Sequence, residues 1–241
     1  MLLRLTGVCK RFGAVTVADA VDLDVARGEA LGIIGANGAG KSSLFNLVTG
    51  VLKPDAGKIE LNGRDVTSVA VRERCLAGIG RSFQIPRPFE SLTVFENLLV
   101  AAQFGRTDPR SDTVELCGDI LHRTGLAAHA NTTAGRLTLL NRKRLELARA
   151  LATGPEIILL DEIAGGLTEG ECGELVSFIR QLHEQGTTIV WIEHIVHALV
   201  SVVSRLVVLE FGRKIADGDP HQVMADPRVR QSYLGIDEAV A

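Results

Sequence analysis

The segment Gly35-Ala36-Asn37-Gly38-Ala39-Gly40-Lys41-Ser42 constrains the fold of this chain more than any other feature. It fits the phosphate-binding pattern G-x-x-x-x-G-K-[ST], in which backbone amides of a glycine-rich loop converge on phosphate oxygens at the start of a helix. The apolar run before it, residues 30–34, predicts a buried parallel strand, and residues 43–48 after it predict a helix. A strand, a glycine loop and a helix in this order indicate an α/β nucleotide-binding core. The alternative is a glycine-rich turn with a solvated lysine.

The side chains of this loop have separate expected roles. Lys41 should reach the β- and γ-phosphates of a nucleoside triphosphate, and Ser42 should be a ligand of Mg²⁺. The expected phosphate-binding residues are Gly35, Asn37, Gly38, Ala39, Gly40, Lys41, Ser42 and Ser43.

Length and composition are those of a globular protein with a sizeable core. The chain has 241 residues, of which 46% are hydrophobic and 23% charged, and its formal net charge of -3 gives no reason to expect a nucleic-acid partner. The four cysteines show no C-x-x-C spacing, so we expect reduced, small core residues in a cytosolic protein. No apolar run approaches the roughly 18 residues needed to span a bilayer, and the N-terminus lacks a signal-peptide core. Any membrane role should therefore come through a partner.

The predicted elements divide the chain into an α/β core and a helical insertion. Strands are predicted at residues 58–61, 79–83, 157–160, 187–192 and 206–209. Helices are predicted at residues 93–102, 113–123 and 141–153, with a breaker-rich loop at 105–110. We therefore expect a nucleotide-binding core formed by residues 1–84 and 154–241, with residues 85–153 inserted as a helical subdomain.

Polar side chains follow two of the predicted buried strands. Asp161 and Glu162 come directly after the aliphatic run 157–160, at the strand end where open α/β sheets bind ligands. Asp161 would hold Mg²⁺ directly or through water, and Glu162 would orient and polarise the attacking water. His194 ends the next strand and would lie beside Glu162 if the two strands are neighbours, where it could bind the γ-phosphate. An acidic strand end or a helix cap is the alternative for the two carboxylates.

In their order along the chain, these motifs resemble the ABC-type ATPase domain over essentially the whole length. The resemblance implies a P-loop NTPase, RecA-like core with an inserted α-helical subdomain and an N-terminal antiparallel β portion. Gln84, in Arg81-Ser82-Phe83-Gln84, resembles the Q-loop glutamine that links Mg²⁺ and the water to a membrane subunit. Phe12 stands where the family stacks an aromatic ring on adenine, with a plain core phenylalanine as the alternative, and Val17 belongs to the same ATP-binding set. The implied catalytic residues are Lys41, Gln84, Glu162 and the switch histidine His194, and the implied Mg²⁺ ligands are Ser42, Gln84 and Asp161.

Three further stretches are similar to the ATP-binding subunits of branched-chain amino acid importers. They are residues 80–97, 144–153 and 226–235. The resemblance implies ATP hydrolysis that energises bacterial uptake of branched-chain or related polar amino acids and amides. It implies polytopic permease subunits, a second ATPase subunit and, indirectly, a substrate-binding protein as partners, at the cytoplasmic face of the inner membrane. The loop 85–89 would receive the coupling helix of the permease, with a rigid surface loop as the alternative.

The signature motif departs from the family pattern L-S-G-G-Q, or L-S-Y-G-Q in this branch. The aligned stretch here is Leu137-Thr138-Leu139-Leu140-Asn141, whose last four residues would contact the ATP of a partner subunit. Thr138 keeps a hydroxyl that can donate to a γ-phosphate, and Asn141 replaces glutamine. Leu140 replaces a glycine that allows close backbone approach, so its isobutyl group should obstruct the phosphate cradle.

This departure has a consequence because ABC domains pair head to tail, with each ATP between one Walker A loop and the partner's signature. The chain's own Walker A loop, Asp161, Glu162 and His194 look complete, whereas its signature would impair the partner's site. We therefore expect a heterodimer with one strong and one weak site, and a homodimer would have two weakened sites. Ile163 also replaces the usual proline after the catalytic glutamate. Thr168 stands where an Asp or Asn is usual, although it equally fits the start of a helix.

Two other functions stay open at this point. A non-transport ABC ATPase of DNA repair or translation is disfavoured, because no coiled coil, zinc module or second ATPase domain is visible and the charge is not basic. A module that holds ATP without turnover would suit the altered signature, but Glu162 and His194 argue against it. An exporter subunit is a further variant, disfavoured by the importer-like stretches.

Overall fold

The computed structural model describes residues 1–107 and 112–231 and contains two β-sheets. The first sheet is antiparallel and consists, in spatial order, of β2 (Val15–Val25), β1 (Leu3–Phe12), β4 (Ala56–Leu61) and β5 (Arg64–Asp65). This sheet confirms the antiparallel β portion expected near the N-terminus.

The second sheet is the centre of the molecule. It consists, in spatial order, of β10 (Arg213–Gly218), β9 (Arg205–Glu210), β3 (Ala30–Ile34), β8 (Thr188–Ile192), β7 (Ile157–Asp161) and β6 (Ile79–Arg81). All neighbours are parallel except β10 and β9. Since parallel strands end at the same edge, the carboxyl ends of β3, β8, β7 and β6 converge on one region.

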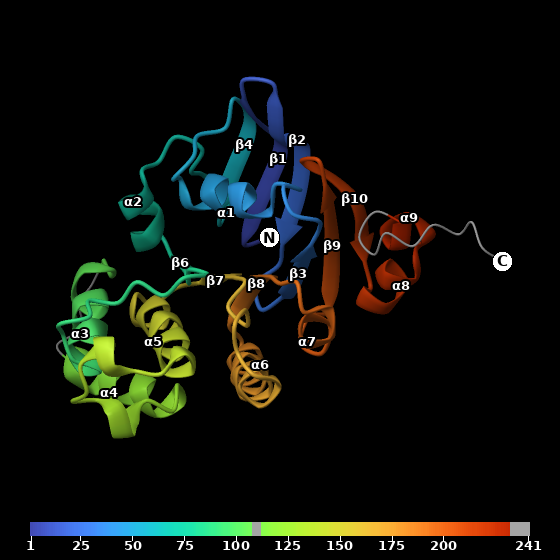
Figure 1. Ribbon diagram of the computed structural model, residues 1–241. Helices are drawn as coiled ribbons and strands as arrows, with labels where there is room; N and C mark the ends of the chain where they lie inside the picture. The colour runs from blue at the N-terminus through green and yellow to red at the C-terminus, as the bar shows by residue number, and fades with distance from the viewer. Residues whose placement is uncertain (108–111, 232–241) are drawn as a thin grey trace.

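Both faces of this central sheet are buried, in two separate hydrophobic cores. Leu31 and Ile33 of β3 face the core that contains the antiparallel sheet and α1 (Lys41–Thr49). Ala30 and Ile34 face the opposite core, which contains α6 (Glu169–Glu184) and α7 (Val196–Val200). Figure 1 shows α1 above the central strands and α6 and α7 below them. Burial on both faces explains the unbroken aliphatic runs of these strands.

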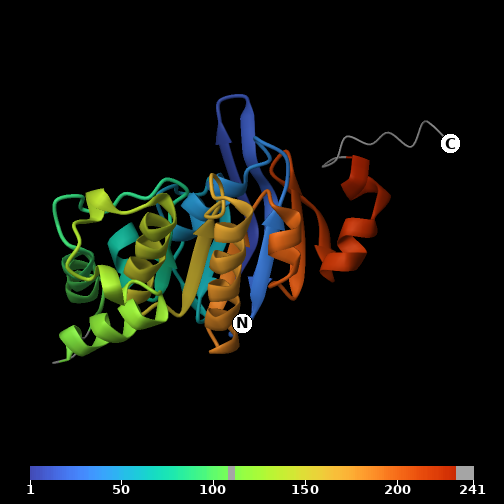
Figure 2. The ribbon, with the colours of Figure 1, turned by 60° about the horizontal axis from the view of Figure 1, so that its bottom comes forward.

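The helical insertion leaves and returns at neighbouring strands of the sheet edge. Between β6 and β7 lie α3 (Val94–Phe104), α4 (Thr113–Arg123), α5 (Leu139–Ala152) and two short 3₁₀ turns at Ala127–His129 and Ala134–Arg136. Figures 1 and 2 both show the three helices grouped on one side of the central sheet. All three predicted helices are therefore confirmed. Of the predicted loop 105–110, residues 108–110 lie outside the part that the structure describes.

The remaining helices cover the edges of the core. They are α2 (Val71–Leu76), which precedes β6, and α8 (Pro220–Ala225) and α9 (Pro227–Val229), which follow β10 on the side opposite the helical insertion (Figure 1). None of the helices in residues 1–107 and 112–231 is long and apolar enough to cross a bilayer.

Two sequence-based expectations need correction. The strand predicted over residues 79–83 ends at Arg81, because Ser82 makes one last bond to Leu159 and the chain then turns away from the sheet with Phe83 exposed. All four cysteines are free, as expected, but only Cys117 and Cys172 are buried. Cys9 and Cys75 are half-buried, so they are not core residues.

Candidate functional site

The phosphate-binding loop is held by close backbone packing against two strands. A Cβ on Gly35 would overlap the carbonyl oxygen of Leu209 in β9, and one on Gly40 would overlap that of Val17 in β2. Gly40 also has φ of 103° and caps α1, so glycine is required there for both reasons. Val17 is thus brought to the loop through its backbone. Residues 36–38 are exposed, which leaves the loop backbone open toward a ligand.

The Lys41 ammonium lies inside the curve of this loop. Its Nζ donates to the carbonyl oxygens of Gly35 at 2.7 Å and Ala36 at 3.1 Å. Burial lowers the pKa of Lys41, while the charges of Glu162 and Asp161 raise it. Lys41 therefore lies between the loop and the two acidic residues, and its contact with the β- and γ-phosphates stays a prediction. Ser42 is exposed and Ser43 is half-buried at the first turn of α1.

Asp161 ends β7 and forms a buried ion pair that the sequence analysis missed. Its Oδ2 accepts from Arg81 Nη2 at 2.7 Å. Arg81 ends β6, the neighbour of β7, and its Nη1 donates to Asn46 of α1 at 2.7 Å. The guanidinium also lies 5.6 Å from the ring centroid of Phe45 and 5.1 Å from that of Phe83. The sequence position of Arg81 could have indicated this ion pair. Arg81 lies three residues before Gln84 in a predicted strand, and Asp161 directly follows another, so the two side chains would meet if these strands are neighbours.

Glu162 is held from both sides by the two residues that the resemblance assigned to catalysis. Gln84 Nε2 donates to its Oε2 at 2.6 Å, and His194 Nε2 lies 2.7 Å from its Oε1. The three side chains come from the ends of the adjacent strands β7 and β8 and from the loop after β6, so the strand order brings them together. The prediction that His194 lies beside Glu162 is confirmed. Glu162 has φ of 47°, a left-handed backbone that is strained for glutamate.

Phe12 is available for a ligand and is not a core residue. Its side chain is 50% exposed at the end of β1, and the Lys10 ammonium lies 5.4 Å from its ring centroid. The core alternative is therefore wrong, while stacking on adenine stays a prediction.

The signature stretch lies at the start of α5, and here the structure corrects the sequence analysis. Leu140 is only 8% exposed and belongs to the hydrophobic core that also contains residues of α6, whereas Leu139 is 43% exposed. Consecutive helical residues are about 100° apart, so the two leucines face different directions. The isobutyl group of Leu140 cannot project into a phosphate cradle, and the exposed apolar side chain is that of Leu139. Thr138 caps the helix by accepting from the Asn141 amide at 3.4 Å.

In the loop after Glu162, Thr168 marks the start of a helix, which is the simpler of the two interpretations of this residue. The Thr168 side chain accepts from the Glu171 amide, and the Glu171 carboxylate accepts from Thr168 in return, which is a capping box for α6. Ile163, which stands in place of the usual proline, is buried in the core beside that helix.

The comparisons with known proteins agree with this geometry. A family profile described as "ABC transporter" matches residues 18–165, and one described as "Branched-chain amino acid ATP-binding cassette transporter" matches residues 213–239. The chain is 36% identical to the high-affinity branched-chain amino acid transport ATP-binding protein LivG of Salmonella typhimurium, over 97% of this chain and 98% of the relative. It is 34% identical to the corresponding BraF protein of Pseudomonas aeruginosa, with the same coverage.

Solved structures resemble the whole chain. The crystal structure of a nucleotide-free ATP-binding cassette from an ABC transporter superposes with a TM-score of 0.88 at 32% identity, covering 98% of this chain and 99% of that one. The ADP conformation of an ATP-binding cassette gives the same TM-score, identity and coverage. With the phosphate loop, the two acidic residues and His194 in one site, and with this similarity over nearly the full length, the chain belongs to the ATP-binding subunits of ABC transporters and is an ATPase.

Proposed function

We propose that this ATPase energises the uptake of branched-chain or related polar amino acids and amides through a membrane permease, from the inner face of a bacterial plasma membrane. The observation that carries the proposal is Glu162, held between Gln84 and His194 in a chain similar over 97% of its length to LivG. A carboxylate with a donor on each oxygen is oriented for proton transfer. The proposed substrate class rests on the relatives LivG and BraF, which are named as branched-chain amino acid transport proteins.

The residues present fit Mg²⁺-dependent hydrolysis of ATP. Asp161, Ser42 and Gln84 supply carboxylate, hydroxyl and amide oxygens, which are the hard donors that Mg²⁺ prefers. When bound, the ion would neutralise charge on the phosphates. Lys41 and the amides of the loop would bind the β- and γ-phosphates, and Phe12 and Val17 would contact the adenosine.

Glu162 would act as the base that accepts a proton from the attacking water. Both of its oxygens are occupied in this structure, so one donor has to move before water can bind there. We assign this movement to Gln84, because it lies on an exposed loop without regular structure, whereas the His194 amide is bonded to the buried Glu193 two residues after a central strand. The loop of Gln84 also borders the surface where a permease would bind, so movement there can couple hydrolysis to docking.

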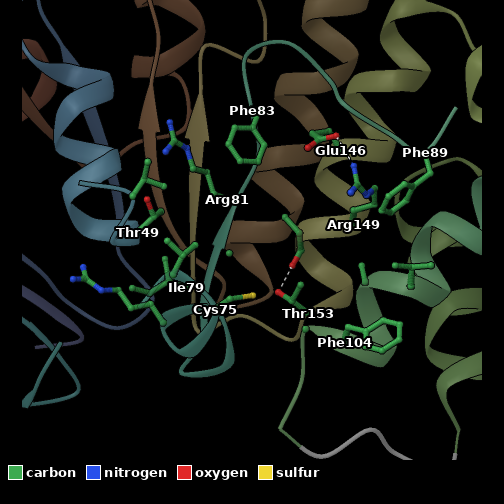
Figure 3. A pocket seen from close by; sticks show the side chains of 18 residues that line it. Thr49, Cys75, Ile79, Arg81, Phe83, Phe89, Phe104, Glu146, Arg149 and Thr153 are labelled. Atoms are coloured by element: carbon green, nitrogen blue, oxygen red, sulfur yellow. Dashed lines mark hydrogen bonds and ion pairs between the residues drawn. The ribbon is translucent and has the colours of Figure 1, made fainter. Parts of the chain in front are cut away.

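The permease would dock in an apolar groove next to this loop. The groove measures about 380 Å³ and lies between α1, α2 and β6 on one side and α3 and α5 on the other. Its lining includes three exposed phenylalanines, Phe83, Phe89 and Phe104 (Figure 3). Contiguous exposed apolar surface marks a protein interaction site. Phe89 belongs to the loop 85–89 that the sequence analysis assigned to the coupling helix, and we keep residues 85–153 as the proposed receiving subdomain.

A pair of matched substitutions tests the docking proposal. Val51 lines the groove and is 57% exposed, whereas Val114 on α4 lies outside it and is 66% exposed. Val51→Asp should abolish co-purification with polytopic membrane proteins, while Val114→Asp should leave it intact. Both variants should keep the ATPase activity of the isolated chain. Equal loss in both variants, or retained binding by Val51→Asp, would place the interface elsewhere.

The transport proposal itself is tested by uptake in the host of this chain. Deleting the gene should lower uptake of radiolabelled leucine, isoleucine or valine, and the wild-type gene should restore it while a Glu162→Gln gene should not. Unchanged uptake of all three amino acids and of related amides would overturn the substrate class.

We further propose that the chain works in a dimer with a different ATPase subunit. The exposed Leu139 side chain and the shorter Asn141 would weaken the site in which this signature meets the partner's ATP. The site built on this chain's own Lys41, Glu162 and His194 would depend on the partner's signature. The expected result is low ATPase activity of the chain alone and a large rise when the second ATPase subunit is added.

A further inference from the structure

Glu193 is a buried acidic residue that the catalytic scheme leaves unused. Its side chain is 1% exposed, and it lies between the last residue of β8 and His194. A buried carboxylate is costly unless it is well hydrogen-bonded, so its hydrogen bonds indicate what it stabilises. Its Oε1 accepts from the Ala164 amide at 2.7 Å, and its Oε2 accepts from the His194 amide at 3.1 Å.

We propose that Glu193 is a positioning residue that clamps the loop after Glu162 to the loop that carries His194. Ala164 lies two residues after Glu162, so Glu193 binds one amide on each of the two segments that carry the catalytic pair. The Glu162 amide also donates to the Ile192 carbonyl at 2.9 Å, which ties the two strand ends together at the backbone. The Glu193 carboxylate is buried, whereas the 2.7 Å contact between His194 and Glu162 is exposed.

The strained backbone of Glu162 explains why such a clamp is needed. A glutamate with φ of 47° persists only where surrounding contacts fix it. The bond from Ala164 to Glu193 fixes the chain just beyond that strained residue. Without it, the loop could relax and move the Glu162 carboxylate away from His194.

Two titratable groups from neighbouring helices lie near the clamp. Lys143 of α5 is buried, which lowers its pKa, and the charge of Glu193 opposes that shift. Cys172 of α6 has its pKa raised by burial and then by Glu193 and Glu169. Burial raises the pKa of Glu193 itself, against bonds from the amides of Ala164, His194 and Ile195 and from the side chain of Trp191. Because α5 begins at the signature, Lys143 brings a cation of the signature helix close to the clamp.

A double-mutant cycle tests this role. Glu193→Gln keeps the size of the side chain but turns an NH₂ group toward amide donors on one side, so hydrogen bonding is lost there. We expect kcat to fall about 10- to 100-fold with the KM for ATP within about 3-fold, because misplacement of a catalytic group mainly affects the chemical step. In a His194→Ala background the same substitution should lower kcat by less than about 3-fold more, because the contact between His194 and Glu162 that the clamp maintains is already absent.

The matched control is Glu29→Gln. Glu29 directly precedes β3, at the end of the strand opposite the phosphate loop, and its side chain is 14% exposed. It accepts from the Ala26 amide at 2.6 Å and from Arg205 at 3.3 Å. Its neutralisation should change stability without lowering basal kcat. If Glu193→Gln does not fold, Glu193→Asp keeps the charge but reaches only one amide, and a smaller fall in kcat with unchanged KM is expected.

The proposal would be overturned if the Glu193 and His194 substitutions lower kcat independently of each other. If the kcat losses of Glu193→Gln and His194→Ala multiply, or if KM and thermal stability fall together with kcat, Glu193 is only a structural acid. The inference rests on the proposed function, in which Glu162 and His194 hydrolyse ATP. The single variant His194→Ala tests that function separately. If His194→Ala alone keeps full activity, the catalytic assignment fails and not the clamp.

Discussion

Arg81 and Asp161 form an ion pair of 2.7 Å in which both side chains are nearly buried. Asp161 directly precedes Glu162, the proposed catalytic base, and the same guanidinium reaches Asn46 of α1. Arg81 therefore connects the helix of the phosphate loop with the acidic strand end. It also lines the apolar groove proposed for the permease, beside Phe83 (Figure 3).

Removal of the Arg81 charge should be strongly destabilising. Arg81→Met leaves the Asp161 carboxylate buried without its cation, and breaking a buried ion pair on one side costs about 3–5 kcal/mol. Urea unfolding monitored by circular dichroism would measure this loss. Arg228→Met provides the contrast, because the Arg228–Asp226 pair lies at the surface with Arg228 well exposed, and its unfolding midpoint should hardly move. Equal shifts for both variants would contradict the account of a buried pair.

Glu162→Gln should separate binding from catalysis. The amide keeps the shape that contacts Gln84 and His194 but cannot accept a proton, so turnover should fall by about 10²- to 10⁴-fold. Binding of a fluorescent ATP analogue should persist, because the phosphate loop is unchanged. Glu174→Gln on α6, which removes an exposed ion pair with Arg144, serves as the control and should retain activity. Unchanged turnover in Glu162→Gln would remove Glu162 from the mechanism.

The sequence predicted those parts of the site whose chemistry depends on one short segment. The phosphate loop, the acidic strand end and His194 could be assigned because each is an apolar strand followed by polar residues. Proximity of His194 to Glu162 needed only the assumption that β7 and β8 are neighbours, which the sheet order confirms.

Other contacts could not be predicted, because they depend on side-chain directions across distant segments. The bond from Arg81 to Asp161 joins residues 80 apart in the sequence, and Glu193 reaches Ala164 across 29 residues. The error at Leu140 has a similar origin. A motif alignment gives the residue type at each position but not which of two adjacent leucines a helix start turns into the core.

The stability that Asp217 contributes should depend on pH. Asp217 accepts from Arg205 and from Lys214 at 2.6 Å each. Burial would raise the pKa of Asp217, but these bonds outweigh burial and hold it below its usual 3.8. A carboxyl with a depressed pKa in the folded state stabilises the fold above its unfolded pKa and loses that contribution as the pH falls through its folded pKa. Asp217→Asn should therefore be less stable than the wild type at pH 7, and the difference should shrink below about pH 4. Urea unfolding across this range would measure it, and a constant difference would contradict the assignment.

Replacement by glycine should affect stability and ATPase rate differently at the two leucines of the signature. Leu139 is exposed, so Leu139→Gly removes the apolar side chain from the signature surface at a cost of about 1 kcal/mol in helix propensity. Leu140 is buried in the core, so Leu140→Gly should leave a cavity and cost about 3–5 kcal/mol. If the exposed side chain weakens the site shared with a partner, Leu139→Gly should raise the ATPase rate of the chain alone, whereas Leu140→Gly should lower stability without raising the rate. Phosphate release and thermal unfolding of both variants would be measured side by side. A wild-type chain that alone hydrolyses ATP as fast as it does with a second ATPase subunit would show that this signature is competent and that no unlike partner is required.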